Sequence, residues 1–188
     1  MKKFKGVFVF SLIVIAIGYL QATTFKSTTI SKLVSTSTHI IKGKVVSVEP
    51  YWTTDKKNDI YTNVVIKIDE VLKGDISNEV VITLRGGQIG DLRVEVDYMP
   101  VLKSGDEGVF FLINHKGKFW IHSIAMGYYQ LLDDHQTGKR IVYSPIGNSV
   151  VENDVSLAKL NAADLNQKYD AQEFLEVIKG VIKNLETK

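Results

Sequence analysis

Cysteine is absent from this chain of 188 residues. Its absence excludes disulfide bonds, thiol catalysis, zinc sites built on cysteine and lipid attachment at a cysteine. The fold must therefore be held by packing alone. Apolar residues make up 45% of the sequence, which is enough for one domain with a substantial core.

The N-terminus carries the longest apolar run of the sequence. Lys2, Lys3 and Lys5 precede an almost unbroken apolar stretch over residues 7–20, and Leu20-Gln21-Ala22 resembles an imperfect cleavage site. The stretch is shorter than the ~20 apolar residues that a membrane-spanning helix needs. We therefore expect a signal peptide over residues 1–22 and an exported protein, periplasmic or extracellular. An uncleaved N-terminal anchor is the alternative.

A strong net charge is also lacking. The chain has 23 basic and 21 acidic residues, and the expected signal peptide takes three lysines and no acidic residue, which leaves 20 and 21. A net charge near −1 argues against nucleic acid as a partner. After cleavage no stable membrane span is expected, so the partner would be a protein or small ligand outside the cytoplasm.

Sequence patterns for catalysis or cofactor binding are missing. The glycine cluster RGGQIGD is not followed by the Lys-Ser or Lys-Thr of a phosphate loop, and Asp91 would repel a phosphate. We interpret Gly86, Gly87 and Gly90 as a structural turn between two strands. The four histidines, at 39, 115, 122 and 135, do not show metal-ligand spacing, and no serine elbow occurs. We therefore expect no catalytic residue, no metal and no cofactor.

Short apolar segments with turn residues between them predict a mainly β fold, either a sandwich or a barrel. The segments HIIKGKVVSVEPYW, IYTNVVIKIDEVLKG, EVVITL, DLRVEVDYM, GVFFLI and RIVY read as strands, as does FWIHSIAMGYYQLL with a break at Gly127. Gly43 lies inside the first strand, where a glycine often marks a bulge. The short apolar run GVFFLI predicts a strand buried on both faces.

Helical patterns flank the strands. Ile30, Leu33 and Val34 have helical spacing, with Ser31 as a candidate cap. Near the C-terminus, Asp170 and Glu173 form a capping box before an apolar helical face that runs from Phe174 to Leu185. A shorter helix is expected over residues 157–165. The predicted organisation is a polar lead with a short helix (23–37), a barrel domain (38–150) and a C-terminal helical segment (151–188) packed on it.

Aromatic residues supply the only candidate ligand site. Tyr51, Trp52 and Tyr61 flank one predicted turn. Aromatic rings on a barrel face can stack on sugars or other planar ligands, although they more often fill a core or cover strand edges.

Four phrases, in order, carry a resemblance to a known family. They are SKLVSTSTHIIKGKVVSVE, IYTNVVIKIDEVLKGD, RGGQIGDLRVEVDYMPVLKSGDEGVFFL and IAMGYYQLLDDHQTGKRIV, and they span about Ser31 to Val142. Together they resemble a family of uncharacterised exported bacterial proteins with an OB-fold, netrin/TIMP-like β-barrel. The resemblance implies an OB-like closed or partly open barrel of five core strands with an extra hairpin. TIMP-like inhibitors reach the catalytic metal of a proteinase with an N-terminal cysteine, which this chain lacks.

The sequence therefore predicts an exported, non-enzymatic binding or protein-interaction module. A cysteine-free, TIMP-like proteinase inhibitor is the first alternative. A metal-dependent enzyme that uses histidine and carboxylate ligands is a weaker one.

Overall fold

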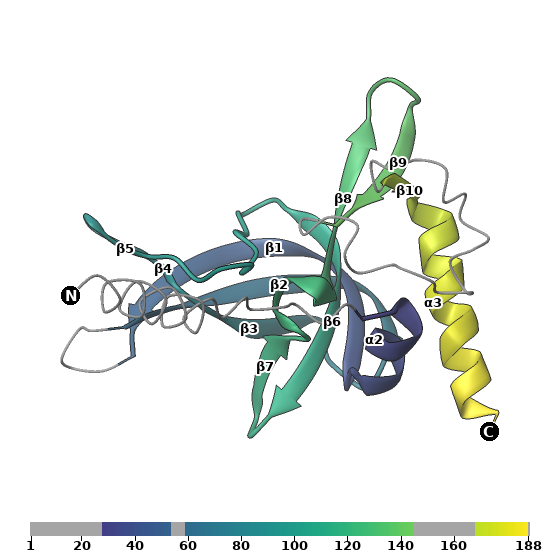
Figure 1. Cartoon of the computed structure of the whole chain (residues 1–188), viewed down its shortest axis with the longest axis horizontal. Helices are drawn as coiled ribbons and strands as arrows, with labels where there is room; N and C mark the ends of the chain where they lie inside the picture. Colours follow the sequence, from purple (N-terminus) through teal and green to yellow (C-terminus); the bar gives the residue numbers. More distant parts are fainter. Residues whose placement is uncertain (1–27, 54–58, 145–167, 188) are drawn as a thin grey trace, which may run out of the picture.

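A computed structural model describes residues 28–53, 59–144 and 168–187 (Figure 1). The expected signal peptide (1–22) and the short helix expected over residues 157–165 lie outside these described residues. Within the described ranges, no helix is both long and apolar enough to cross a bilayer.

Five strands form a ring at the centre of the molecule. They are β1 (His39–Trp52), β2 (Ile60–Lys73), β3 (Glu79–Arg85), β6 (Glu107–His115) and β7 (Lys118–Ile121), paired in the order β1-β2-β3-β7-β6 with β6 returning to β1. All pairs are antiparallel except β3 with β7, which meet at the single parallel pair Ile82–Phe119. The ring is therefore open between β3 and β7. This confirms the prediction of a mainly β protein with a partly open, OB-like barrel.

Further strands extend the sheet beyond the ring. β8 (Tyr128–Asp134) pairs with β6, and β9 (Lys139–Tyr143) and β10 (Lys168–Asp170) follow in order. The β8–β9 hairpin projects from the barrel at the top of Figure 1. A 3-10 turn, η1 (Ile124–Gly127), separates β7 from β8.

Gly43 lies at a bulge, as expected. The register of β1 against β2 shifts between Lys42 and Gly43, and a Cβ on Gly43 would lie 2.5 Å from the carbonyl oxygen of Lys67. Only glycine allows the two backbones to approach this closely, and the bulge bends the long first strand around the ring.

Two separate cores follow from the alternation of side chains along the strands. Phe110 and neighbouring inward side chains fill the barrel, whereas Phe111 points outward into a second core that includes Tyr129 and Phe174. Val109, Phe110, Phe111 and Leu112 are all fully buried, which confirms the strand predicted to be buried on both faces.

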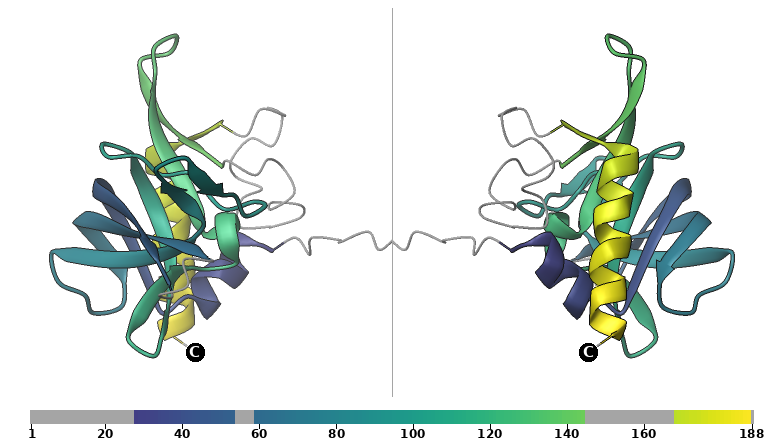
Figure 2. Two further views of the ribbon diagram at one scale, coloured as in Figure 1. Left: turned by 90° about the vertical axis from the view of Figure 1, so that its left-hand side faces the viewer. Right: turned by 90° about the vertical axis from the view of Figure 1, so that its right-hand side faces the viewer.

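Two helices cover the outer core. α2 (Ile30–Thr36) and α3 (Ala171–Glu186) pack together against the outer faces of β1, β6, β8 and β9, and Figure 2 shows α3 running along the side of the sheet. Asp170 caps α3 as predicted, since its carboxylate accepts from the backbone N–H groups of Gln172 and Glu173. The cap of α2 is Thr29, not Ser31, because the Thr29 hydroxyl accepts from the Lys32 N–H one turn later.

The end of β2 holds the short helix in place. The Lys73 ammonium donates to the carbonyl oxygens of Val34 and Ser37 at 2.6 and 2.7 Å, at the C-terminus of α2. A cation at this position satisfies carbonyls that have no partner within the helix. The following Gly74 adopts φ +87° against Thr38 and His39. The sequence Val-Leu-Lys-Gly at residues 71–74 thus joins the barrel to α2.

Candidate functional site

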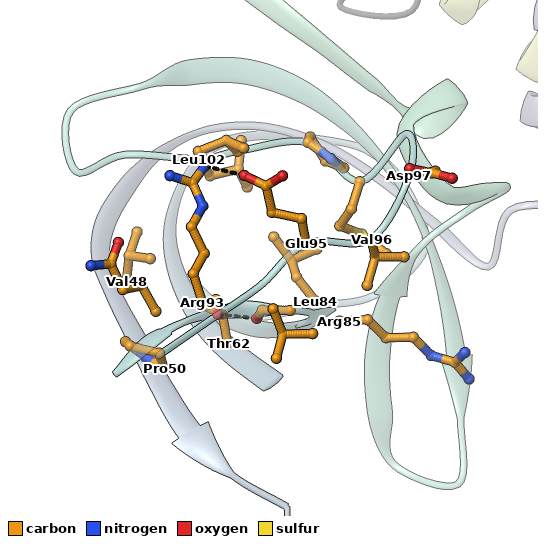
Figure 3. Close-up of a pocket in the computed structure, with 17 residues that line it drawn as sticks. Val48, Pro50, Thr62, Leu84, Arg85, Arg93, Glu95, Val96, Asp97 and Leu102 are labelled. Carbon is orange, nitrogen blue, oxygen red and sulfur yellow. Dashed lines mark hydrogen bonds and ion pairs between the residues drawn. The ribbon is translucent and has the colours of Figure 1, made fainter. Parts of the chain in front are cut away.

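A cleft opens at the end of the barrel that lies away from α3. A small separate sheet, β4 (Gly87–Ile89) paired with β5 (Leu92–Val94), lies beside the ends of β1 and β2, and the chain returns from it through residues 95–101 (Figures 1 and 3). The strand predicted over residues 91–99 is thus limited to Leu92–Val94 and belongs to this hairpin rather than to the ring. The cavity enclosed there has a volume of about 590 Å³.

Glycines allow the hairpin to sit close to the barrel. The Gly86 N–H donates to the Ile60 carbonyl at 2.8 Å, and the Thr62 hydroxyl donates to the Gly86 carbonyl at 2.7 Å. Gly86, Gly87 and Gly90 all have positive φ angles. At Gly87 a Cβ would lie 2.5 Å from the Thr62 hydroxyl oxygen, whereas at Gly90 it would meet nothing within 4 Å. Gly87 therefore sets the approach to the barrel, and Gly90 serves the turn.

The larger cavity is lined by apolar side chains and by four charged ones, those of Arg85, Arg93, Glu95 and Asp97. The apolar lining side chains come from β1, β3, β5 and residues 96–102, namely Val48, Pro50, Leu84, Val94, Val96, Met99, Pro100, Val101 and Leu102. Arg93 and Glu95 form an ion pair at 2.6 Å with both side chains more than half exposed (Figure 3). Such an exposed pair contributes little to stability.

A second cavity, of about 300 Å³, adjoins the first. Its lining residues are Thr83, Leu84, Arg85, Val96, Met99, Trp120, Ile121 and Ile124. Four of these, Leu84, Arg85, Val96 and Met99, also line the larger cavity. The two cavities are therefore neighbours that share part of their lining, and together they form the cleft. The cleft lies next to the single residue pair that joins β3 and β7.

Exposed apolar side chains border this cleft. Leu92, Tyr98, Val101 and Ile124 have exposed fractions between 38% and 74%. They come from the hairpin, the returning segment and η1, so three separate pieces of chain place apolar surface in water around the two cavities. Exposed apolar side chains near a cavity are typical of a binding site.

Unusual backbone conformations occur at the same place. Tyr98, Ser123 and Ile124 have φ angles of 62°, 52° and 60°. The left-handed region is unfavourable for residues with a Cβ, above all for a β-branched residue such as Ile124. Strain of this kind persists where the surrounding structure enforces it and is concentrated at ligand-binding sites. Here it orients Ile124 into the wall of the smaller cavity.

The aromatic residues expected to bind a ligand do not line either cavity. Tyr51 and Tyr61 are cross-strand partners on the outer face of β1 and β2, with ring centroids 6.4 Å apart, and Tyr61 meets the edge of Trp120 at 6.1 Å. Trp52 is the next residue after Tyr51, so it points to the opposite face of β1. The structure thus brings Tyr51 and Tyr61 together with Trp120, and Trp120 connects this half-buried aromatic row to the smaller cavity.

A hydrogen-bonded chain of three side chains lies beside η1. The Thr36 hydroxyl donates to the Lys32 carbonyl, so it accepts from Nε2 of His122 at 2.9 Å. Nδ1 of His122 then accepts from the Ser123 hydroxyl at 2.6 Å. A hydroxyl bonded to a neutral imidazole is a nucleophile–base pair in outline, but neither His122 nor Ser123 lines the cleft.

Acidification is expected to destabilise the protein through His122. Burial lowers the pKa of this imidazole below its ordinary value of 6.5, so the unfolded chain takes up a proton first as the pH falls. The contribution of neutral His122 to the free energy of unfolding is fully present above pH 6.5. It is lost as the pH falls from there through the folded-state pKa, by at most about 1.4 kcal/mol per pH unit. Urea unfolding of the wild type and His122→Gln between about pH 7.5 and 5.5 measures this slope.

The same pH range avoids a second titration. The Arg140 guanidinium donates to Glu107 and holds the pKa of that carboxyl below its ordinary value of 4.5, so its contribution is lost only at lower pH. A wild-type slope that His122→Gln leaves unchanged would contradict the assignment to His122.

The remaining histidines are dispersed. His39 packs its ring against Phe119 at 5.0 Å, His115 is the last residue of β6, and His135 lies in the β8–β9 turn. Within the described ranges, no three histidine, aspartate or glutamate side chains lie close enough together to hold a metal ion.

Sequence reasoning missed the residues that shape the cleft. Arg85 ends an ordinary strand and Trp120 lies in another, and nothing in their local pattern separates them from structural residues. One signal was present, since Leu92 and Tyr98 are large apolar residues in a segment that also carries charges at every second position. No known family model matches the chain, and no curated protein has a sequence significantly similar to it.

Proposed function

We propose that the chain is an exported, non-enzymatic interaction module that binds an extended segment of a partner protein in the cleft beside the β4–β5 hairpin. One observation carries the proposal: two joined cavities with apolar walls open on a surface bordered by exposed apolar side chains. Export rests on the N-terminal sequence.

The shape of the cleft favours a polypeptide over a small ligand. A compact ligand in either cavity would leave Leu92, which is 61% exposed and lines neither cavity, in water. An extended peptide can place one side chain in each cavity, on the two sides of the segment 95–101, and cover the apolar border between them. The exposed apolar border of the cleft would then become the apolar centre of a protein–peptide interface.

The lining of the two cavities supports a binding role rather than catalysis. It includes neither histidine nor serine, and its one hydroxyl near the hairpin, that of Thr62, already donates to Gly86. General acid–base catalysis needs a titratable group within hydrogen-bonding reach of the substrate. The exposed carboxylates Glu95 and Asp97 lie at the cavity edge, and Glu95 is paired with Arg93.

Selection from a random peptide library on the immobilised exported chain tests this function. Peptides that bind the wild type are expected to lose about 10-fold or more of their affinity for Val101→Asp, because a charge would replace apolar contact at the border of the cleft. Leu132→Asp is the matched control, since Leu132 is 39% exposed on the projecting β8–β9 hairpin. Failure to select any peptide, or equal losses for both variants, would contradict the proposal.

A further inference from the structure

We propose that the smaller cavity recognises the C-terminal residue of the partner, with a large apolar side chain between its walls and the terminal carboxylate on Arg85. This inference rests on the proposed function and specifies which part of a partner the cleft takes. It rests on two features that lie together, an apolar cavity and an arginine that forms no ion pair with any described residue.

Arg85 differs from the other arginines of the chain. Arg93 pairs with Glu95, and Arg140 pairs with Glu107. The Arg85 side chain has no ion pair or hydrogen bond with any residue in the described part of the chain. A guanidinium presents several donors in a planar fork that matches a carboxylate, and no described residue occupies that fork on Arg85.

The position of Arg85 directs this charge to the smaller cavity. Arg85 is the last residue of β3 and the cross-strand partner of Tyr61, whose ring meets Trp120. Figure 3 shows its side chain extending away from Arg93 and Glu95, which stand at the edge of the larger cavity. Arg85 lines both cavities, and it shares the smaller one with Trp120.

The rest of that cavity carries no charge. Apart from Arg85 its lining is Thr83, Leu84, Val96, Met99, Trp120, Ile121 and Ile124. Apolar walls of this kind select an aromatic or branched side chain, and the aromatic ring of Trp120 adds stacking area. A residue that satisfies both the walls and the guanidinium must carry an apolar side chain and a carboxylate on the same unit, which describes the C-terminal residue of a polypeptide.

The geometry is also held in place before any ligand arrives. Ile124 is kept in the left-handed region by the turn that follows β7, and Gly127 in the same turn leaves no room for a Cβ, which would lie 2.5 Å from the His122 carbonyl. A wall fixed in this way costs less to order when a ligand binds.

Two small probes test the inference. N-acetyl-phenylalanine carries the free carboxylate, and N-acetyl-phenylalanine amide has the same side chain without the charge. In NMR spectra of the backbone N–H groups of the exported chain, N-acetyl-phenylalanine is expected to shift signals around Trp120 and Ile124. It should bind about 10-fold or more tightly than N-acetyl-phenylalanine amide, because its hydrogen bond to the guanidinium is charge-assisted. The difference should shrink at high salt concentration.

Variants separate Arg85 from a general charge effect. Arg85→Gln is expected to bring the acid down to the affinity of the amide, whereas Arg93→Gln, on the other side of the cleft, should leave the preference intact. Both arginines are exposed, so neither change should alter the fold, which the unchanged spectrum outside the cleft would show. Equal binding of acid and amide, or an acid preference that survives Arg85→Gln, would overturn the inference.

The experiments distinguish a failure of C-terminal recognition from a failure of the proposed peptide-binding function. If selected peptides bind through Val101 but tolerate amidation of their C-terminus, the C-terminal recognition is wrong and the interaction cleft stands. If no peptide depends on Val101 while the acid probe still requires Arg85, the carboxylate subsite stands and the wider peptide-binding function is wrong.

Discussion

Replacing Phe174 by alanine is expected to lower the free energy of unfolding by about 3–5 kcal/mol. The Phe174 side chain is fully buried, and its ring lies 4.8 Å from Tyr129 and 6.4 Å from Tyr169. It is the main anchor of α3 in the outer core, so its removal leaves a cavity between the helix and the sheet. A loss of this size is a large part of the ~5–15 kcal/mol that stabilises a typical domain. Urea unfolding measured by circular dichroism gives the change.

Leu185→Ala on the same helix provides the control. Leu185 is 44% exposed in the last turn of α3, so its truncation should change stability by no more than about 0.5 kcal/mol. If Phe174→Ala were as mild as Leu185→Ala, α3 would not be packed tightly on the outer core.

Replacing Gly87 by alanine is expected to displace the β4–β5 hairpin from the barrel. The added Cβ would lie 2.5 Å from the Thr62 hydroxyl oxygen, 3.1 Å from Ile60 and 3.2 Å from Pro50, at a φ of +144°. Overpacking and backbone strain each cost about 1–3 kcal/mol, so a total loss of about 2–6 kcal/mol is expected. The bond from Thr62 to the Gly86 carbonyl would be lost with it, and the larger cavity would change shape.

Gly90→Ala separates the contact from the backbone effect. Gly90 also has a positive φ, +59°, but a Cβ there would meet nothing within 4 Å, so only strain of about 1–2 kcal/mol is expected. Thermal or urea unfolding of both variants measures the difference, and peptide binding should be impaired only for Gly87→Ala. Equal stability and equal binding of the two variants would show that Gly87 does not seat the hairpin on the barrel.

Local pattern was sufficient for most of the barrel. Strict alternation in β2 and the apolar run around Phe110 identify strands because side-chain period and burial are local properties. The bulge at Gly43 and the cap at Asp170 were predictable for the same reason, since each depends on one residue type in one conformation. The mainly β class therefore follows from the sequence pattern, whereas the OB-like barrel was expected from the family resemblance.

Features set by long-range contacts were not accessible. The alternation of Leu92, Val94, Val96 and Tyr98 predicts one strand over this segment. In the structure Tyr98 adopts a left-handed conformation, and only the consecutive residues Leu92–Val94 pair with a neighbouring strand. The rest of this segment does not join the ring. Local alternation carries no information on whether a partner strand is available.

The cleft could not be predicted from the sequence, because it also depends on long-range contacts. Arg85 and Trp120 are 35 positions apart in the sequence and share a cavity only because β3 and β7 run parallel and meet at Ile82 and Phe119. Tyr51, Trp52 and Tyr61 are aromatic and close together in the sequence, which is why they predict a ligand site. The structure places Tyr51 and Tyr61 beside Trp120 instead of in a cavity of their own.

The position of the bound peptide tests the central claim most directly. A peptide selected on the exported chain is titrated into isotope-labelled protein, and the backbone amides whose NMR signals shift are mapped. Binding in the cleft predicts that the shifts concentrate in residues 84–102 and 120–124, on both sides of the returning segment. Shifts confined to the β8–β9 hairpin or to α3, with the cleft unchanged, would contradict it.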